Sequence, residues 1–391
     1  MKNDKKPKIR FKGFDDDWEQ RKLGELGEIM IGSTPSTSKL EYYSEEGIPW
    51  VTPTDINALT ISGTPKKLSE KGMKVGRVVP ANTILCTCIA SIGKNALLTV
   101  KGSFNQQINS LTPSAENDSY FLLTESELWS EKMKRMAASG TMQIVNKTEF
   151  SELDTMVPSL DEQKIIGSYF RNLDNLITLH QRKCDKLQKI KKSMLEKMFP
   201  KNEAKKPEIR FKGFNNDWEQ RKFGDFGKAT GGTSIESEFS DDGIYKVISI
   251  GSYSENSIYN DQGIRAIKSD KTSNRVLNRN DLTMILNDKT TSGNIIGRVL
   301  LIEESGIYVY NQRTERIEIN IDEYVPLFLY EMLNAPNIRE KIIKQAQGNT
   351  QIYVNWTTIA LLDYMVTSKE EQVKIGEYLH SIGNLITLHQ G

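Results

Sequence analysis

The chain has 391 residues, of which 37% are hydrophobic and 26% are charged, with a formal net charge of +1. That length supplies two hydrophobic cores of about 150 residues each, and the balanced charge gives no overall signal for nucleic acid. No run approaches the ~18 apolar residues of a membrane span, and no apolar signal-peptide core follows the first residues, so we expect a cytoplasmic protein. The three cysteines have no metal-binding spacing and are expected to be free thiols.

Residues 1–160 are expected to form the first globular domain. Short apolar runs bounded by turn residues predict strands. In chain order the expected elements are a strand at Ile48–Thr52, a turn that leads into a buried strand within Val78–Cys88, a strand at Ala96–Val100 and a helix at Tyr120–Ala138, which precedes the polar segment Gly140–Gln143.

Residues 161–200 are predicted to form one long spacer helix. No proline interrupts the run from Asp161 to Phe199, and acidic residues at its start favour the helix dipole. Apolar residues recur at heptad spacing along one face, with one polar step at His180, which is typical of a coiled-coil seam. The seam residues are Ile166, Phe170, Leu173, Ile177, Leu187, Ile190, Met194 and Met198.

The chain then repeats itself after a short linker at residues 201–206. Between Pro7–Gly27 and Pro207–Gly227, 15 of 21 positions are identical. The start of the long helix also returns, since Asn175–Gln181 reappears as Asn384–Gln390. We therefore expect an internal duplication, with a second globular domain at 207–368 and a second helix at 369–391.

The second helix stops one residue past Gln390, whereas the first continues to Phe199. The first helix leaves the first domain for the second, and the second helix points back, so the two are expected to run antiparallel. Half of the seam, from Ile166 to Ile177, must then be covered by the first domain, by a partner subunit or by a second copy of the chain. Self-association through this seam is one of these possibilities.

The two globular domains are expected to share a framework and to differ in their loops. Ile296-Gly297-Arg298 matches Ile92-Gly93-Lys94, and a strand at Asn280–Leu286 stands where Val78–Cys88 stood. Gly348–Gln351 likewise matches Gly140–Gln143. Loops that differ on a shared framework suggest that the two domains bind two different things.

No sequence motif for catalysis is convincing. The region before Gly93-Lys94 lacks the glycine pattern of a phosphate-binding loop, and no cofactor-binding fingerprint is present. Glu162-Gln163-Lys164 has the acid-x-lysine spacing of some magnesium nucleases, but its counterpart, Glu371-Gln372-Val373, lacks the lysine. Acidic residues at helix starts have an ordinary structural explanation, which we favour.

Several loop residues have the hydrogen-bonding groups that read DNA bases. Asn and Gln pair with adenine, Arg and Lys with guanine, and Thr with more than one base. The candidates are Lys94, Asn105, Gln106, Gln107, Lys289, Thr290, Arg298, Asn311, Gln312 and Arg313. Asn105 and Asn311 occur in both copies and equally suit a structural turn, so Gln107 and Arg313, which differ, are the better candidates. The run from Arg182 to Lys206 has ten basic and three acidic residues, which fits either a solvated helix face or contact with a partner or DNA.

The order of these motifs resembles the specificity subunit of bacterial type I restriction-modification systems. The resemblance rests on the duplicated Pro-x-Ile-Arg-Phe-x-Gly-Phe-x-x-x-Trp block, on Gly140–Gln143 and Gly348–Gln351, and on Glu-Gln opening both long helices. It implies an α+β fold, in which two target-recognition domains with mixed α/β sheets are separated by long antiparallel coiled-coil helices.

The resemblance further implies that each globular domain reads one half of a split double-stranded DNA site. The helices are then expected to dock methyltransferase and restriction subunits. No metal or cofactor is expected in this subunit, whereas the partner subunits use S-adenosylmethionine, ATP and Mg. Three alternatives stay open from the residues alone: a DNA-binding regulator without enzyme partners, a duplicated nuclease and a two-headed protein adaptor.

Overall fold

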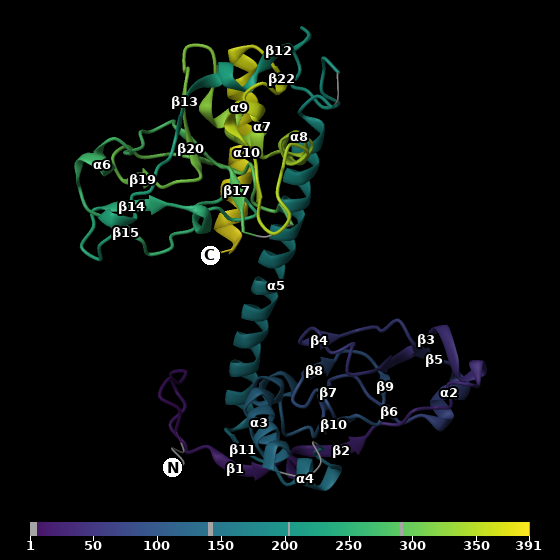
Figure 1. Ribbon diagram of the computed structural model, residues 1–391. Coiled ribbons are helices and arrows are strands. Elements are labelled where there is room, and N and C mark those ends of the chain that lie inside the picture. The colour runs from purple at the N-terminus through teal and green to yellow at the C-terminus, as the bar shows by residue number, and fades with distance from the viewer. Residues whose placement is uncertain (1–5, 140–143, 202–203, 290–291, 391) are drawn as a thin grey trace. The chain divides into compact units, whose positions relative to one another are not determined.

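The computed structural model describes residues 6–139, 144–201, 204–289 and 292–390 (Figure 1). Two compact units divide the chain, residues 1–178 and 179–391, so the long first helix contributes to both. The sequence segments Gly140–Gln143 and Thr290, singled out above, lie outside the described residues.

The main sheet of the first unit has the strand order β2-β10-β7-β8-β4. Neighbouring strands are antiparallel except β4 and β8, which are parallel. The bounds are β2 (Gly27–Ile31), β4 (Thr60–Ile61), β7 (Thr83–Thr87), β8 (Asn95–Leu98) and β10 (Ile108–Pro113). Helix α3 (Ser119–Ser139) packs on β7 and β8 (Figure 1). The strands predicted at Val78–Cys88 and Ala96–Val100 and the helix at Tyr120–Ala138 correspond to β7, β8 and α3.

Strand β7 is buried on both faces, which explains the apolar residues at its centre; the hydroxyls of its buried end residues, Thr83 and Thr87, donate to backbone carbonyls. Ile84 and Cys86 belong to the core beneath α3, together with Trp129. Leu85 points to the other face, where it packs with Phe104 and neighbouring aliphatic side chains. Alternate residues of a strand face opposite sides, so a central strand between two cores favours apolar residues on both faces.

A second, smaller sheet completes the first unit. Its order is β5-β3-β9-β6, and β3 and β9 run parallel. The bounds are β3 (Tyr43–Val51), β5 (Lys67–Leu68), β6 (Val78–Val79) and β9 (Gly102–Phe104), and a separate ribbon joins β1 (Glu19–Lys22) to β11 (Asp154–Val157). Short helices complete the unit: α1 (Leu23–Leu26), η1 (Leu40–Tyr42), α2 (Glu70–Val75) and α4 (Lys147–Ser151).

The second unit repeats this topology. Its main sheet has the order β13-β20-β16-β18, its smaller sheet the order β15-β14-β19 with β14 and β19 parallel, and its ribbon joins β12 to β22. The bounds are β12 (Glu219–Lys222), β13 (Gly227–Gly231), β14 (Tyr245–Ile248), β15 (Arg265–Ala266), β16 (Leu282–Ile285), β18 (Val299–Leu301), β19 (Tyr308–Tyr310), β20 (Thr314–Ile319) and β22 (Asp363–Val366). The expected duplication is thus confirmed in the strand order, although the described sheets of the second unit have no strands that correspond to β4 and β6.

The helices of the second unit differ in one respect. Where α3 is continuous, the second unit has α7 (Pro326–Asn334) and α8 (Pro336–Ile343), because Ala335 is extended and Pro336 starts a new helix. The remaining elements are η2 (Phe223–Phe226), η3 (Glu236–Glu238), η4 (Ile250–Ser252), α6 (Asp270–Ser273), α9 (Trp356–Ile359) and the pair β17 (Asn287–Asp288) and β21 (Ile352–Tyr353).

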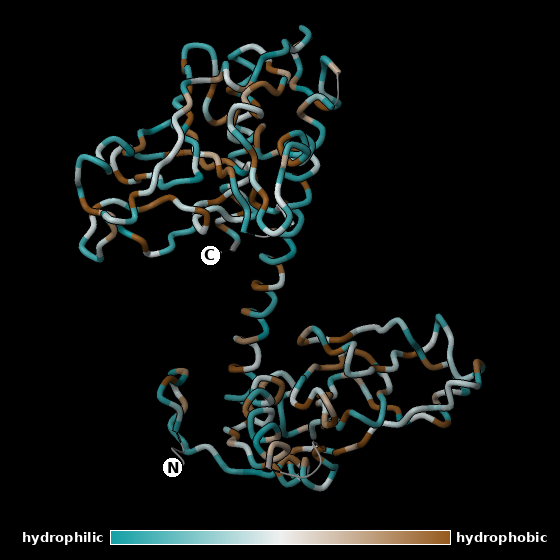
Figure 2. The backbone as a smooth tube through the Cα atoms, viewed as in Figure 1, coloured by the Kyte–Doolittle hydropathy of each residue, from teal (hydrophilic) through white to brown (hydrophobic). Residues whose placement is uncertain are grey.

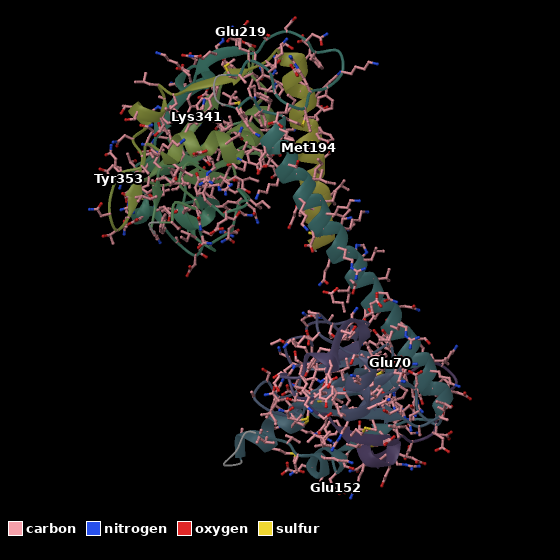
Figure 3. All side chains as sticks on the ribbon, turned by 90° about the vertical axis from the view of Figure 1, so that its right-hand side faces the viewer. Glu70, Glu152, Met194, Glu219, Lys341 and Tyr353 are labelled. Carbon is pink, nitrogen blue, oxygen red and sulfur yellow. The ribbon has the colours of Figure 1, made fainter. Side chains whose placement is uncertain are left out.

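Helix α5 (Leu160–Lys197) confirms the predicted long helix, and hydrophobic positions recur along it in Figure 2. Its last part runs antiparallel to α10 (Lys369–Gln390) within the second unit. His180 Nδ1 lies 2.9 Å from His389 Nδ1. Further along, Lys191 lies beside Gly383, and Met198 shares a core with Ile375. Successive positions along α5 therefore contact progressively earlier residues of α10, so the two helices run in opposite directions. Met194 lies on α5 where α10 passes (Figure 3).

Each long helix is tied at its start to the duplicated Pro-x-Ile-Arg-Phe block by a buried ion pair. Arg10 Nε and Nη2 donate to the two carboxylate oxygens of Glu162, both at 2.7 Å. Arg210 binds Glu371 in the same way, with the same distances. The Glu162 and Glu371 side chains are 1% and 0% exposed. Two parallel charge-assisted hydrogen bonds fix both distance and orientation.

We predict that Glu371→Ala lowers the free energy of unfolding by about 1.5–3 kcal/mol, because it removes two charge-assisted hydrogen bonds from the partly buried Arg210 guanidinium. Urea unfolding followed by circular dichroism measures the change. Glu219→Ala is the matched control, because its pair with Arg221 is exposed and is worth less than about 1 kcal/mol. Equal losses in the two variants would contradict the structural importance assigned to the buried pair.

Candidate nucleic-acid interface

Three connections meet at one end of the main sheet in the first unit. The β2–β3 connection starts at Gly32, whose N–H donates to the Ile108 carbonyl. The β9–β10 loop, Asn105–Gln107, is joined to the end of β7 by a hydrogen bond from Cys88 N–H to the Gln107 carbonyl. The β7–β8 turn ends at Lys94, whose carbonyl accepts the Thr87 N–H. Backbone hydrogen bonds therefore hold these polar loops in one cluster.

The second unit builds the same cluster with the same backbone bonds. Gly232 N–H donates to the Thr314 carbonyl and Leu286 N–H to the Arg313 carbonyl. Gly297, at the end of the β17–β18 connection, donates to the Ile285 carbonyl, as Gly93 does to Thr87. Gly93 and Gly297 both have positive φ, 85° and 69°, so both turns need a residue without a Cβ penalty.

The two asparagines that occur in both units are buried and hydrogen-bond the backbone of the loops. Asn105 is buried, its Oδ1 accepts the Gln107 N–H at 3.0 Å, and its Nδ2 lies 3.2 Å from Gln107 Oε1. Asn311 is buried as well, and its Oδ1 accepts the Ile235 N–H at 3.1 Å. Both side chains stabilise turns, which agrees with the expectation that Asn105 and Asn311 suit a structural turn.

The residues that follow face outward. Gln106 and Gln312 are exposed, and each is positioned by a neighbour across the cluster, Thr34 Oγ1 and Glu236 respectively. Gln107 is half-buried. Arg313 is exposed, with a positive φ of 68°. Among the described residues no hydrogen-bond or ion-pair partner engages its guanidinium, so that group is available to a ligand.

The other basic candidates differ in accessibility. Lys94 and Lys289 are exposed at the turns that follow the central strands. Arg298 is half-buried, and its guanidinium donates to the Asn294 carbonyl at 3.2 Å and to Ser257 Oγ at 3.1 Å. Burial lowers the pKa of Arg298. In the structure the Arg298 side chain braces the β17–β18 connection through Ser257, which is 41 residues away in the sequence, and its contact with DNA stays a prediction.

A pair of arginines that the sequence analysis missed also anchors the cluster. Arg77 donates to the Ile31 carbonyl at 2.7 Å, and its N–H binds Ser33 Oγ. Arg275 donates to the Gly231 carbonyl at 2.9 Å and to Thr233 Oγ1 at 3.0 Å, and lies over the Tyr310 ring. Both arginines precede a valine and stand five residues before an Asn with positive φ, Asn82 or Asn280. That repeated spacing is the signal that could have revealed them.

The segment Gly348–Gln351 forms an exposed tip in the second unit. Two backbone hydrogen bonds close the loop, because the Gln347 N–H donates to the Tyr353 carbonyl and the Tyr353 N–H donates to the Gln347 carbonyl. Gly348 has φ of 101°, and a Cβ there would lie 2.1 Å from the Gln351 carbonyl oxygen, so glycine is required. Tyr353 lies at the surface of the unit (Figure 3), and Val354 N–H binds the Leu286 carbonyl. This polar tip therefore adjoins the loop cluster.

A buried carboxylate lies beneath the second cluster. Glu315, the second residue of β20, is 5% exposed. Burial raises its pKa to about 7, and the nearby Arg275 acts in the opposite direction. In the strand register Glu315 lies opposite Gly231, as Asn109 lies opposite Ile31 in the first unit. The two clusters thus differ in charge at an otherwise equivalent position.

The described residues contain no group of three or more His, Cys, Asp or Glu side chains suited to hold a metal ion. Glu162, the acid considered for a magnesium site, has both oxygens bound by Arg10. Among the helices described, none combines the length and apolar character needed to cross a membrane.

We predict that Glu315→Gln stabilises the protein increasingly as the pH rises. The carboxyl pKa is about 7 in the folded chain against an ordinary 4.5, so the wild type loses stability as the pH rises from about 4.5 to 7, and the loss is complete above 7. The glutamine has no such cost, and the gain should reach on the order of 2 kcal/mol. Urea unfolding at pH 5 and pH 8 measures it.

Glu318→Gln is the control for that measurement, because Glu318 lies on the same strand with a 61% exposed side chain. It should alter the pH profile far less. Parallel profiles for Glu315→Gln and the wild type would show that Glu315 is not held in an unfavourable environment.

Comparison with known families connects this arrangement to one group of proteins. Residues 15–189 and 215–391 each match the sequence model described as the type I restriction modification DNA specificity domain. Three curated relatives are the type I restriction enzyme specificity subunits MjaIX and MjaVIII of Methanocaldococcus jannaschii and HindI of Haemophilus influenzae.

The MjaIX subunit is 28% identical over 240 residues, which cover 56% of this chain and 53% of that protein. The HindI subunit is 30% identical over 171 residues, covering 41% of this chain and 37% of that protein. The MjaVIII subunit is 25% identical over 387 residues, covering 95% of this chain and 88% of that protein. The matched region thus spans about half of the first relative and less of the second.

A solved structure shares the fold. The S subunit of the type I restriction-modification system from M. genitalium superposes with a TM-score of 0.66 at 14% identity, covering 98% of this chain and 94% of that one. Two family matches, one for each unit, account for the duplicated sheets and loops described above. The chain belongs to the type I restriction modification DNA specificity family and carries the domain of that family twice.

Proposed function

We propose that this protein is the specificity subunit of a type I restriction-modification complex and that it binds a double-stranded DNA target in two parts, one read by each unit. The observation that supports this most directly is the pair of equivalent loop clusters. The backbone bonds that hold the clusters are the same, whereas one position differs, with the half-buried Gln107 in the first cluster and the exposed Arg313 in the second.

The chemistry of these loops suits direct reading of base edges. A glutamine amide can donate to and accept from adenine, and an arginine guanidinium can donate twice to guanine. The exposed lysines beside them, Lys94 and Lys289, suit the phosphate backbone, which positions a protein on DNA without reading its sequence. Each cluster therefore combines a candidate base reader with a candidate phosphate contact.

The proposal assigns no catalytic step to this chain. Methylation and cleavage belong to partner methyltransferase and restriction subunits, which bring S-adenosylmethionine, ATP and Mg. The long helices are the proposed docking elements for these partners. The engagement of Glu162 by Arg10 supports this assignment, because it gives a structural reason for the one acidic motif that resembled a nuclease.

We predict that Gln107→Ala and Arg313→Gln each weaken recognition at one base position by about 1–3 kcal/mol. Glutamine is preferred to alanine at Arg313 because it keeps a long unbranched polar side chain at a position with positive φ. Binding is measured by titration of labelled duplexes in which one base pair at a time is varied. Lys94→Ala is the matched control, because a lost phosphate contact weakens binding to all sequences alike. Equal losses on specific and random DNA would assign Gln107 and Arg313 structural roles.

We also predict that the two units read their parts independently. Replacing residues 18–158 with the corresponding domain of another family member should change one part of the recognised sequence and leave the other unchanged. The measurement is the sequence preference of the chimaera in complex with its methyltransferase partner. A simultaneous change in both parts would contradict the assignment of one part to each unit.

A further inference from the structure

Gln106 and Gln312 occupy equivalent positions in the two loop clusters, yet their neighbours bind opposite ends of the two side-chain amides. Each glutamine is exposed and directly follows the buried asparagine of its loop. In the first unit Thr34 Oγ1 donates to Gln106 Oε1. In the second unit Gln312 Nε2 donates to Glu236 Oε1 at 3.3 Å. The two amides are therefore oriented by different partners.

The loop around Thr34 is anchored on both sides of that residue. The Ser33 carbonyl accepts a hydrogen bond from Trp50 Nε1 at 3.1 Å. The Pro35 carbonyl accepts a hydrogen bond from the Tyr43 hydroxyl at 2.7 Å. Because both flanking residues are held in this way, the Thr34 hydroxyl has a defined position beside the glutamine.

Glu236 is held in place by an adjoining hydrogen bond. Asn311 Oδ1 accepts the Ile235 N–H at 3.1 Å, and Ile235 is 1% exposed. Two successive residues of one loop, Asn311 and Gln312, thus bind two successive residues of the other. An ionised carboxylate only accepts hydrogen bonds. The Gln312 amide must therefore present its nitrogen to Glu236, which leaves its oxygen available.

The groups that remain available differ in hydrogen-bonding character. Across the described part of the chain, no residue engages Gln106 Nε2 or Gln312 Oε1. Gln106 therefore offers an amide NH2, which only donates. Gln312 offers its oxygen and one remaining N–H, and the second carboxylate oxygen of Glu236 lies on the same side-chain pair. The first cluster is thus mainly donating at this point, and the second is mainly accepting.

The edges of DNA bases in the major groove divide by the same property. Adenine and cytosine carry an exocyclic amino group there, which donates, whereas guanine and thymine carry a keto oxygen, which accepts. An amide NH2 therefore pairs with a keto base, and an amide or carboxylate oxygen pairs with an amino base.

We propose that Thr34 and Glu236 set the base preference of the two glutamines. The first unit then selects a keto base, guanine or thymine, at the position that Gln106 contacts. The second unit selects an amino base, adenine or cytosine, at the position that Gln312 contacts. Thr34 and Glu236 are positioning residues, because they act through the orientation of an amide. The inference rests on the proposed function, since it requires both clusters to meet the major groove.

The test is selection of duplexes from a random pool by the full chain in complex with its methyltransferase partner. Gln106→Glu should reverse the preference at one position of the first element, from guanine or thymine to adenine or cytosine, because a carboxylate only accepts. Thr34→Val removes the hydroxyl that orients Gln106 and should reduce the keto preference at that position by roughly tenfold. The second element should stay unchanged in both variants and serves as an internal control.

The reciprocal variant is Glu236→Ala. It frees the Gln312 amide to rotate and should reduce the preference for an amino base at one position of the second element by roughly tenfold. Affinity for random DNA should not fall, because the variant removes a negative charge. Glu318→Ala is the matched control: it removes a carboxylate with a 61% exposed side chain from the far part of β20, and it should alter neither element.

Base analogues test the unaltered protein, so the result does not depend on the folding of a variant. Replacing the selected adenine with unsubstituted purine, or the selected cytosine with a pyrimidinone, removes the amino group and should weaken binding by roughly tenfold. Two enriched elements whose base preferences stay the same in Gln106→Glu and Glu236→Ala would overturn the inference and leave the proposed function standing. So would an amino base at the Gln106 position or a keto base at the Gln312 position. Absence of any enriched element would overturn both.

Discussion

The bidentate ion pair between the Pro-x-Ile-Arg-Phe block and the start of each long helix is the contact on which the organisation of both units depends. It joins residues 152 and 161 positions apart, Arg10 with Glu162 and Arg210 with Glu371. Removing two such charges from water is costly, and the cost is offset only when both hydrogen bonds form in the correct geometry. The ion pair therefore specifies where each helix starts relative to its sheets. It also explains why the Pro-x-Ile-Arg-Phe block and the Glu-Gln pair at the start of a long helix occur together in both units.

The two units share the same framework of strands and turns but differ in the exposed residues of their loops. The central strands are buried on both faces, and glycines or asparagines with positive φ set the turns at their ends. Buried asparagines and the anchoring arginines Arg77 and Arg275 hold the loops in place from within. The exposed positions between these anchors differ between the two units while the framework is kept, as the proposed reading of two different target parts requires.

Local sequence patterns predicted the long helix, the central strands and the duplication, because each depends on short-range signals such as heptad spacing, apolar runs and repeated motifs. The roles of individual polar residues depended on partners distant in the sequence. Arg298 has the residue type of a base reader, but Ser257 and the Asn294 carbonyl engage it. Glu162 has the spacing of a metal ligand, but Arg10 occupies both its oxygens. Arg77 was overlooked because nothing near it in the sequence indicates the Ile31 carbonyl that it binds.

The central claim is that two loop clusters on one framework read two separate parts of a DNA target. It is tested most directly by selecting, from a pool of random duplexes, the DNA that the protein retains in complex with its methyltransferase partner, and by sequencing the selected molecules. We expect two short conserved elements separated by positions without base preference. A single continuous element, or no enrichment of any sequence over random DNA, would contradict it.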